Sequence, residues 1–210
     1  MSELRVVDEN VLARDVSFDE YMEKYAENFA EWIEGTVIKL SPVTLIHDML
    51  SQFFILLLRT YLYTTKDGKL RAAPFVMRTK PGLPGREPDL HIVLMERLNI
   101  IRDTITEGPA DIVIEIVSKG TRDKDLIEKF EEYQAAGVRE YWIIDPTHRV
   151  ADFYVLDETG IYKRAELHNG HFHSTVLLRF RLDTAILWQQ DKLEDDEFIR
   201  ATVAAMLKES

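Results

Sequence analysis

The 210-residue sequence contains no cysteine, which excludes disulfide bonds, thiol catalysis and cysteine-bound zinc. It has no continuous apolar run of the roughly 18 residues that suggest a membrane span. Its first ten residues, MSELRVVDEN, are acidic and lack the apolar segment of a signal peptide. We therefore expect a cytoplasmic protein with no membrane partner.

Positive charge is scarce: 26 Lys and Arg stand against 37 Asp and Glu, a net charge of −11. A general affinity for nucleic acid is not expected, because neutralising phosphates requires Lys and Arg. The stretch 59–86 is the exception, with seven basic residues and one acidic residue. This stretch is either a solvated charged hairpin or a surface that binds a polyanion.

The length and the 46% hydrophobic content suit one globular domain over residues 1–210. We expect an N-terminal helix at about 17–30 and a C-terminal helix at about 193–208 as additions to it. Between them we expect a strand pair in EWIEGTVIKLSP, then a buried helix that Ser41 and Pro42 open and that runs to about Tyr63. Strands follow near 70–79 and 90–94. The order of these elements predicts an α/β fold with a mixed central sheet, flanking helices and a β-rich C-terminal extension.

Glu115 is the only charged residue in IVIEIV, a β-branched run typical of a strand covered on both faces. Its side chain should share a face with Val113 and Val117. Burying an isolated carboxylate costs several kcal/mol unless cations or hydrogen bonds compensate. Glu115 is therefore either paired structurally with a buried cation or, as we favour, functional.

Asp89 poses the same question at the entrance of the strand 90–94, directly after Pro88. Alone, Pro-Asp is a common turn signal. If Asp89 meets Glu115 on an adjacent strand, the two carboxylates repel each other unless they share a hard cation. Oxygen ligands of this kind suit Mg²⁺, or Mn²⁺ in its place.

A helix in TRDKDLIEKFEEYQAAG, opened by Thr121 and closed by Gly137, supplies the candidate catalytic lysine. Its apolar stripe places Lys129 near the inward face, and Asp125, one turn earlier, could orient it. The alternative is an ordinary surface ion pair. His47, on the buried helix, is either a satisfied core residue or part of the site. A third carboxylate could come from Glu31 or Glu34, and periodicity does not decide between them.

Taken together, these segments resemble the Uma-type restriction endonucleases of the PD-(D/E)xK nuclease superfamily. The resemblance extends from about Ser17 to Trp188. It rests on EWIEGTVIKLSP, His47, REPDL, PADIVIEIVS, TRDKDLIEKFEEYQAAGVREYWIIDP and FRLDTAILW.

The resemblance implies an endonuclease-like α/β core in which Asp89 fills the PD position and Glu115 the acidic position of the (D/E)xK element. Val117 stands where the superfamily has lysine, so the lysine is expected on the next helix as Lys129, with Lys119 as a rival. The implied metal ligands are Asp89, Glu115 and the backbone carbonyl of Ile116.

The function expected on this basis is Mg²⁺-dependent hydrolysis of nucleic-acid phosphodiester bonds, with DNA as the expected substrate and a homodimer as the expected state. The phosphate backbone of the nucleic acid would be held by basic residues of the stretch 59–86: Arg71, Arg78, Lys80 and Arg86. The alternative is a protein that keeps the nuclease fold for binding or assembly without turnover.

Overall fold

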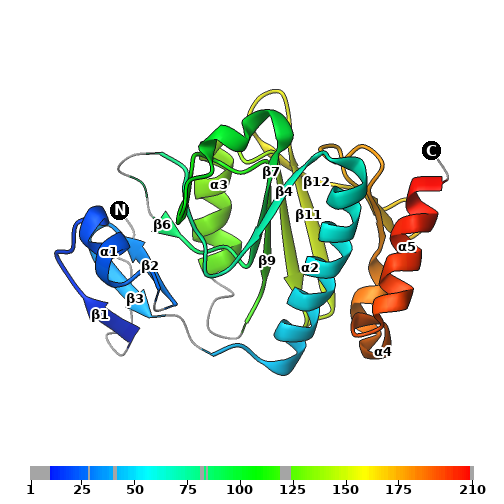
Figure 1. Cartoon of the computed structure of the whole chain (residues 1–210), viewed down its shortest axis with the longest axis horizontal. Coiled ribbons are helices and arrows are strands. Elements are labelled where there is room, and N and C mark those ends of the chain that lie inside the picture. Colours follow the sequence, from blue (N-terminus) through cyan, green and yellow to red (C-terminus); the bar gives the residue numbers. More distant parts are fainter. Residues whose placement is uncertain are drawn as a thin grey trace.

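The computed structural model describes residues 10–27, 29–39, 42–80, 83, 85–118 and 124–208, without the side chains of residues 124–126. Its centre is a six-stranded mixed sheet between two layers of helix (Figure 1). From edge to edge the strands are β12 (Tyr162–Arg164), β11 (Val150–Leu156), β10 (Glu140–Asp145), β9 (Ile112–Ile116), β7 (Leu90–Leu94) and β4 (Gly68–Ala72).

The strand that carries Glu115, β9, lies in the middle of this sheet, parallel to β10 and antiparallel to β7. All of its residues are buried. Its three isoleucines face one hydrophobic cluster and Val113 faces another, on the opposite side of the sheet. The prediction of a central strand covered on both faces is confirmed.

Helix α2 (Leu45–Thr65) covers the isoleucine face. It begins after Thr44, whose hydroxyl accepts a hydrogen bond from the His47 amide, and not at the predicted Pro42; Ser41 lies outside the described residues. By length and composition α2 is the one described helix that could cross a membrane, but half of its most apolar segment is buried in the protein. Its apolarity is that of a core helix.

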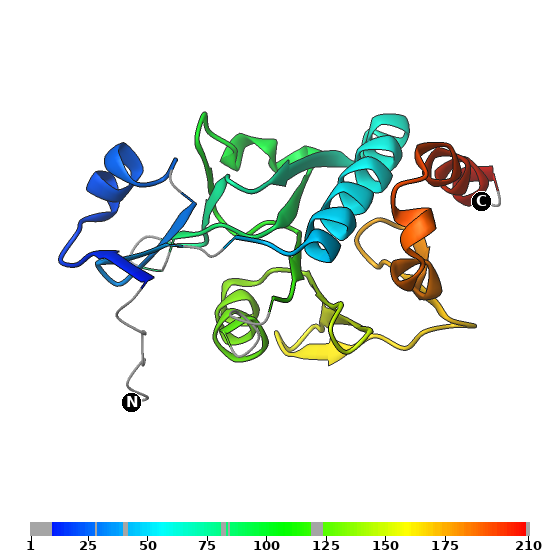
Figure 2. The same cartoon turned by 90° about the horizontal axis from the view of Figure 1, so that it is seen from below.

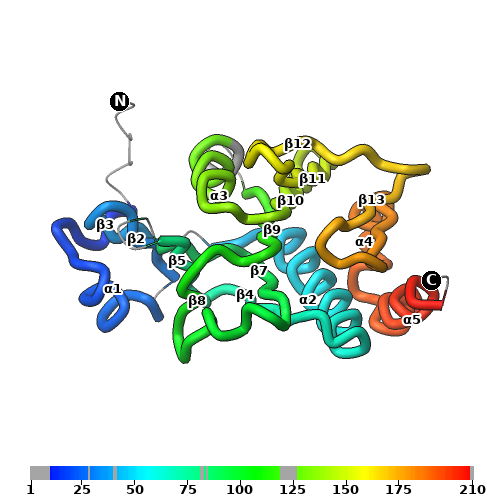
Figure 3. Tube along the Cα trace, turned by 90° about the horizontal axis from the view of Figure 1, so that it is seen from above, coloured from blue at the N-terminus to red at the C-terminus, as the bar shows by residue number. Residues whose placement is uncertain are grey.

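The other face is covered by a π-helical turn (Lys124–Lys129) that continues into α3 (Phe130–Ala136). Gly137, at a φ of +87°, ends α3 as predicted, because a left-handed residue there costs glycine little. The predicted start at Thr121 lies outside the described residues. Figures 2 and 3 show α2 and α3 on opposite sides of the sheet.

A second sheet forms around the predicted strand pair, which is confirmed as β2 (Ala30–Ile33) and β3 (Thr36–Lys39). Helix α1 (Phe18–Lys24) packs beside it and is shorter than the predicted 17–30, because the chain turns after Lys24 and enters β2 at Ala30. The strand order is β1 (Val11–Ala13), β3 (Thr36–Lys39), β2 (Ala30–Ile33), β6 (Gly85–Arg86), β5 (Val76–Arg78) and β8 (Ile105–Glu107).

Two more predicted elements are divided in the structure. The predicted strand 70–79 is two strands, β4 and β5, which belong to different sheets. The predicted C-terminal helix is two helices, α4 (Gln190–Leu193) and α5 (Asp196–Lys208), which pack against α2 at the end of the molecule opposite α1 (Figure 1). The remaining elements are the 3₁₀ helices Met95–Ile100 and Thr184–Trp188 and the hairpin of β13 (His171–His173) and β14 (Arg181–Asp183).

Candidate active site

Asp89 lies directly before β7, and Glu115 lies near the end of the neighbouring strand β9. In the antiparallel pair of β7 and β9, Leu90 lies opposite Ile114, so the next position of the same register places Asp89 opposite Glu115. Directly opposed residues of an antiparallel pair point to the same face, with their Cβ atoms about 4.5–5.5 Å apart. Continued by one position, this register puts the two predicted carboxylates at the same end of the central sheet.

Glu115 is held from the α3 side. Its side chain lies on the face of Val113 and Val117, as predicted, and only 3% of the residue is exposed. Lys129 Nζ donates a hydrogen bond to Glu115 Oε1 at 2.8 Å, and the Tyr133 hydroxyl donates to the same oxygen at 3.1 Å. The cation and the phenol together supply the compensation that a buried carboxylate requires.

Lys129 occupies the inward position that its helical periodicity predicted. It is buried, and a second carboxylate oxygen, Glu31 Oε1, lies 3.5 Å from its ammonium nitrogen. Because Lys129 ends the π-helical turn and Tyr133 follows one turn later on α3, both side chains reach the same carboxylate. The rival Lys119 and the side chain of Asp125 lie outside the described residues.

Asp89 makes two contacts at the mouth of the strands. Its Oδ2 accepts a hydrogen bond at 2.7 Å from the backbone N–H of Ile116, at the end of β9. Its Oδ1 lies 3.2 Å from Nε2 of His47, which is buried in the first turn of α2. The predicted supporting residue His47 thus reaches Asp89, and the carboxylate links the end of β9 to the start of α2.

The choice between Glu31 and Glu34 is decided by position. Glu31 lies on β2, is fully buried and faces Lys129 and Arg86. Glu34 lies in the turn after β2 at a φ of +46° and is exposed. The prediction that Glu34 supports the site is therefore wrong, because the turn carries it out to solvent.

Arg86 requires a second correction. It was predicted to contact nucleic acid, but its side chain is only 2% exposed. It contacts Glu31 at 3.3 Å, binds Glu132 through two nitrogens and lies 3.8 Å from Glu128. Burial alone would lower its pKa, but the carboxylates of Glu31 and Glu132 reverse this and raise it. Arg86 therefore stabilises buried acids and offers no surface to a phosphate.

Glu87 also belongs to this cluster, and sequence reasoning missed it. It is buried beside the Tyr21 hydroxyl, 3.2 Å from Glu87 Oε1. Burial, together with the charge of Glu31, raises the pKa of Glu87 to about 8, which favours the protonated form of this carboxyl. No spacing rule distinguished Glu87 from an ordinary polar residue before a proline.

The other predicted basic contacts remain at the surface. Arg71 and Arg78 are partly exposed, and their guanidinium groups lie 5.5 Å from the Phe75 ring and 3.8 Å from the Phe18 ring. Lys80 is exposed and donates to the carbonyl of Ala135 at 3.3 Å. These three side chains are accessible to an anion, in contrast to Arg86.

The side chains of this site offer few ligands to a metal ion. In the described part of the chain, no three His, Asp or Glu side chains form a ready-made metal site. Mg²⁺, however, is commonly bound by only one or two carboxylates and keeps several waters. Asp89 and Glu115, on opposed strand positions, fit an ion of that kind and do not fit one that requires a full set of protein ligands.

Comparisons with known proteins support the fold. The chain is similar to a solved structure described as a "putative nuclease belonging to DUF820" from Anabaena variabilis, with a TM-score of 0.69 and 15% identity. The similarity covers 83% of this chain and 98% of that one, which establishes the shared fold. No functionally curated protein matches the sequence.

A family match adds to the likeness in fold. The family described as "Uma2: Putative restriction endonuclease" matches residues 18–185, a span that includes Glu31, His47, Asp89, Glu115 and Lys129. With this match over most of its length, the chain belongs to the Uma2 family, and the predicted resemblance is confirmed.

Proposed function

We propose that this protein is a Mg²⁺-dependent endonuclease that hydrolyses phosphodiester bonds, with DNA as the first substrate to test. The observation that carries the proposal is the opposition of Asp89 and Glu115 at one sheet end, with Lys129 on Glu115. The family and the nuclease-like fold support nuclease function.

Each residue of the cluster has a proposed task. Asp89, Glu115 and the Ile116 carbonyl would hold the ion, which when bound polarises a phosphate and lowers the pKa of a bound water. Lys129 carries a positive charge at the carboxylate edge and stabilises negative charge that develops on the phosphate. His47 and the Ile116 amide keep the Asp89 carboxylate in one orientation.

The surrounding ion pairs position Lys129. Glu31 lies between Lys129 and Arg86, and Arg86 is fixed in turn by Glu132 of α3. Glu31 of β2 therefore contacts Lys129 directly, and Arg86 links Glu31 to Glu132 of α3. Preorganised charges of this kind need no rearrangement when the substrate arrives.

Nucleic acid would approach over the accessible cations Arg71, Arg78 and Lys80. The net charge of −11 means that binding should depend on these local charges and weaken steeply with salt. A homodimer and a cytoplasmic location stay predictions of the sequence.

A cleavage assay tests the proposal. Supercoiled plasmid, single-stranded circular DNA and RNA are incubated with purified protein and Mg²⁺ or Mn²⁺. We expect nicking by the wild type, loss of nicking in Asp89→Asn, and retention in Asp103→Asn, which replaces an exposed aspartate. Equal cleavage by the wild type and Asp89→Asn would identify a contaminant. No cleavage of any substrate would reject the proposal.

One observation favours the second candidate, a nuclease fold kept for binding or assembly. Glu115 is already paired with Lys129, and no three-ligand metal site exists among the described residues. Titration calorimetry separates the two functions, because an enzyme of the proposed type must bind Mg²⁺ or Mn²⁺. An absence of measurable heat with both ions would favour the binding protein.

A further inference from the structure

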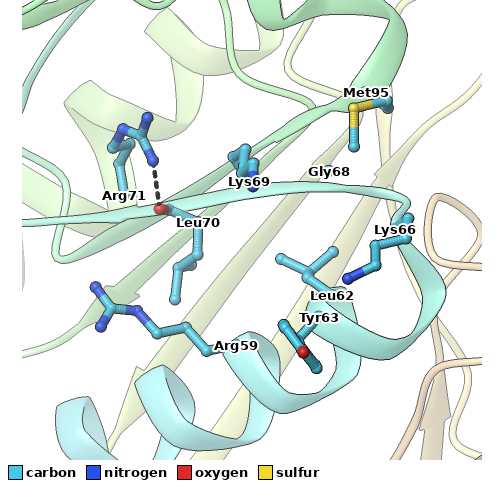
Figure 4. Close-up of a pocket in the computed structure, with 9 residues that line it drawn as sticks. All are labelled: Arg59, Leu62, Tyr63, Lys66, Gly68, Lys69, Leu70, Arg71 and Met95. Atoms are coloured by element: carbon cyan, nitrogen blue, oxygen red, sulfur yellow. Dashed lines mark hydrogen bonds between the residues drawn. The ribbon is translucent and has the colours of Figure 1, made fainter.

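A basic hollow lies at the edge of the central sheet, away from the carboxylate cluster. It has a volume of about 430 Å³ and lies between the C-terminal half of α2 and the edge strand β4. Figure 4 shows the α2 side chains on one side of β4, and Lys69 and Arg71 on the other. Its polar and charged lining residues are Arg59, Tyr63, Lys66, Lys69 and Arg71.

The charge of this hollow is opposite to that of the protein. Four of its lining residues are cations, and none of its nine lining residues is acidic, although the whole chain carries −11. The nearest acids in sequence, Asp67 and Glu96, line an adjoining hollow, and Asp67 accepts a hydrogen bond from Tyr61. Like charges gathered in this way repel each other, and an anion would relieve the repulsion.

The hollow also has an aromatic surface. The Tyr63 side chain is 77% exposed, and Lys66 Nζ lies 3.9 Å from its ring centre. Met95, also exposed, lines the opposite end (Figure 4). Cations beside an accessible ring are the combination with which proteins bind single-stranded nucleic acid: the charges follow the phosphates, and the ring stacks on a base.

The strand register relates this hollow to the carboxylate cluster. Arg71 lies opposite His91, two residues from Asp89, and the Ala73 amide donates to the Asp89 carbonyl. At about 3.4 Å per residue, β4 therefore extends from the level of Asp89 to Gly68 over about 17 Å. Because side chains alternate, Lys69 and Arg71 lie on the same face of the sheet as Asp89 and Glu115.

We propose that this hollow binds a single-stranded segment of nucleic acid at a distance from the bond that is cleaved. Arg59, Lys69 and Arg71 would contact phosphates, and Tyr63 would stack on one base. The inference rests on the proposed function for the identity of the ligand, but it concerns binding and requires no catalysis.

Fluorescence anisotropy with a labelled single-stranded oligonucleotide, in EDTA to prevent cleavage, tests this inference. Arg59→Gln/Lys69→Gln removes two exposed charges, and Lys163→Gln/Lys208→Gln is the matched control elsewhere on the surface. We expect about tenfold weaker binding for the first pair and an unchanged affinity for the control. The salt dependence should also fall by about 1.4 in its logarithmic slope, about 0.7 for each lost contact.

Tyr63→Ala gives an independent readout, since it removes stacking and no charge. It should weaken binding about tenfold with an unchanged salt slope. Equal binding by the wild type and all hollow variants would overturn the inference, as would an absence of oligonucleotide binding. Binding of ATP without binding of the oligonucleotide would also overturn it, in favour of a nucleotide pocket.

The two proposals fail in distinguishable ways. If the wild type cleaves DNA with Mg²⁺ while the hollow variants bind it normally, the inference falls and the nuclease stands. If the hollow variants lose binding while the wild type never cleaves, the inference stands and the nuclease falls.

Discussion

Both ends of the central sheet carry buried carboxylates, but the hydrogen-bond partners of these carboxylates differ between the two ends. At one end, Glu140 accepts hydrogen bonds from the Trp142 indole, the Ser174 and Thr175 hydroxyls and the amides of Thr175 and Val176. At the other end, the described partners of Glu115 are the Lys129 amine and the Tyr133 phenol, and the strand register puts a second carboxylate, Asp89, at the same end of the sheet.

Asp111 extends the contrast, since it lies at the same end as Glu140. It is fully buried and accepts from the Leu94 amide and the Arg97 guanidinium, both at 2.8 Å. Asp111 and Glu140 connect chain segments that are distant in sequence. We interpret the carboxylates that several fixed donors hold as structural, and Asp89 and Glu115 beside Lys129 as the proposed metal site.

Replacing Glu140 should have the largest effect. Glu140→Ala removes the shared acceptor of five hydrogen bonds, so the free energy of unfolding should fall by about 4 kcal/mol. For a chain of this size the melting temperature should fall by about 8–16 °C. Thermal unfolding of Glu140→Ala beside Glu158→Ala, an exposed control, measures this. Equal melting temperatures would show that the Glu140 cluster is not structural.

Replacing Lys129 should act on catalysis. Lys129→Met removes the only described cation within hydrogen-bond distance of Glu115, and the cleavage rate should fall by about 10²–10³-fold. Single-turnover rates are compared with Lys163→Met, well below the melting temperature of both variants. A nearly unchanged cleavage rate would show that another residue supplies the catalytic amine, with Lys119 as the first candidate.

Tyr133→Phe should have the smallest effect of the three. It removes one hydrogen bond to Glu115, and the rate should fall about tenfold, equivalent to about 1.4 kcal/mol. Tyr162→Phe is a matched control, because this hydroxyl is also buried on the α3 side but donates to the Val138 carbonyl. Tyr162→Phe should lower the free energy of unfolding and leave the cleavage rate unchanged. Equal cleavage rates in both variants would show that the Tyr133 hydroxyl has no role in catalysis.

The sequence predicted the parts of the site that depend on local periodicity. Strand alternation placed Glu115 on the Val113 face, and helical spacing turned Lys129 inward. The fold class followed from the order of elements, and the similar solved structure confirms it.

What the sequence could not predict depends on contacts between distant segments. Glu31 and Glu34 differ in burial because the chain turns at Glu34. Arg86 has the sequence pattern of a surface cation, and its burial depends on Glu132 of α3, which is distant in the sequence. The burial of Glu87 against Tyr21 joins residues 66 positions apart. The sequence did not mark Glu140 as a structural acid, because its partners Ser174 and Thr175 come from a distant segment of the chain.

The most direct test of the account compares Glu115→Gln with Glu140→Gln in one experiment, measuring cleavage rate and melting temperature for both. We expect Glu115→Gln to lose cleavage by at least about 100-fold and to stay folded. Glu140→Gln should keep its cleavage rate per folded molecule and melt at a lower temperature. Full cleavage by Glu115→Gln, or the same behaviour in both variants, would contradict the catalytic role of Glu115 and the structural role of Glu140.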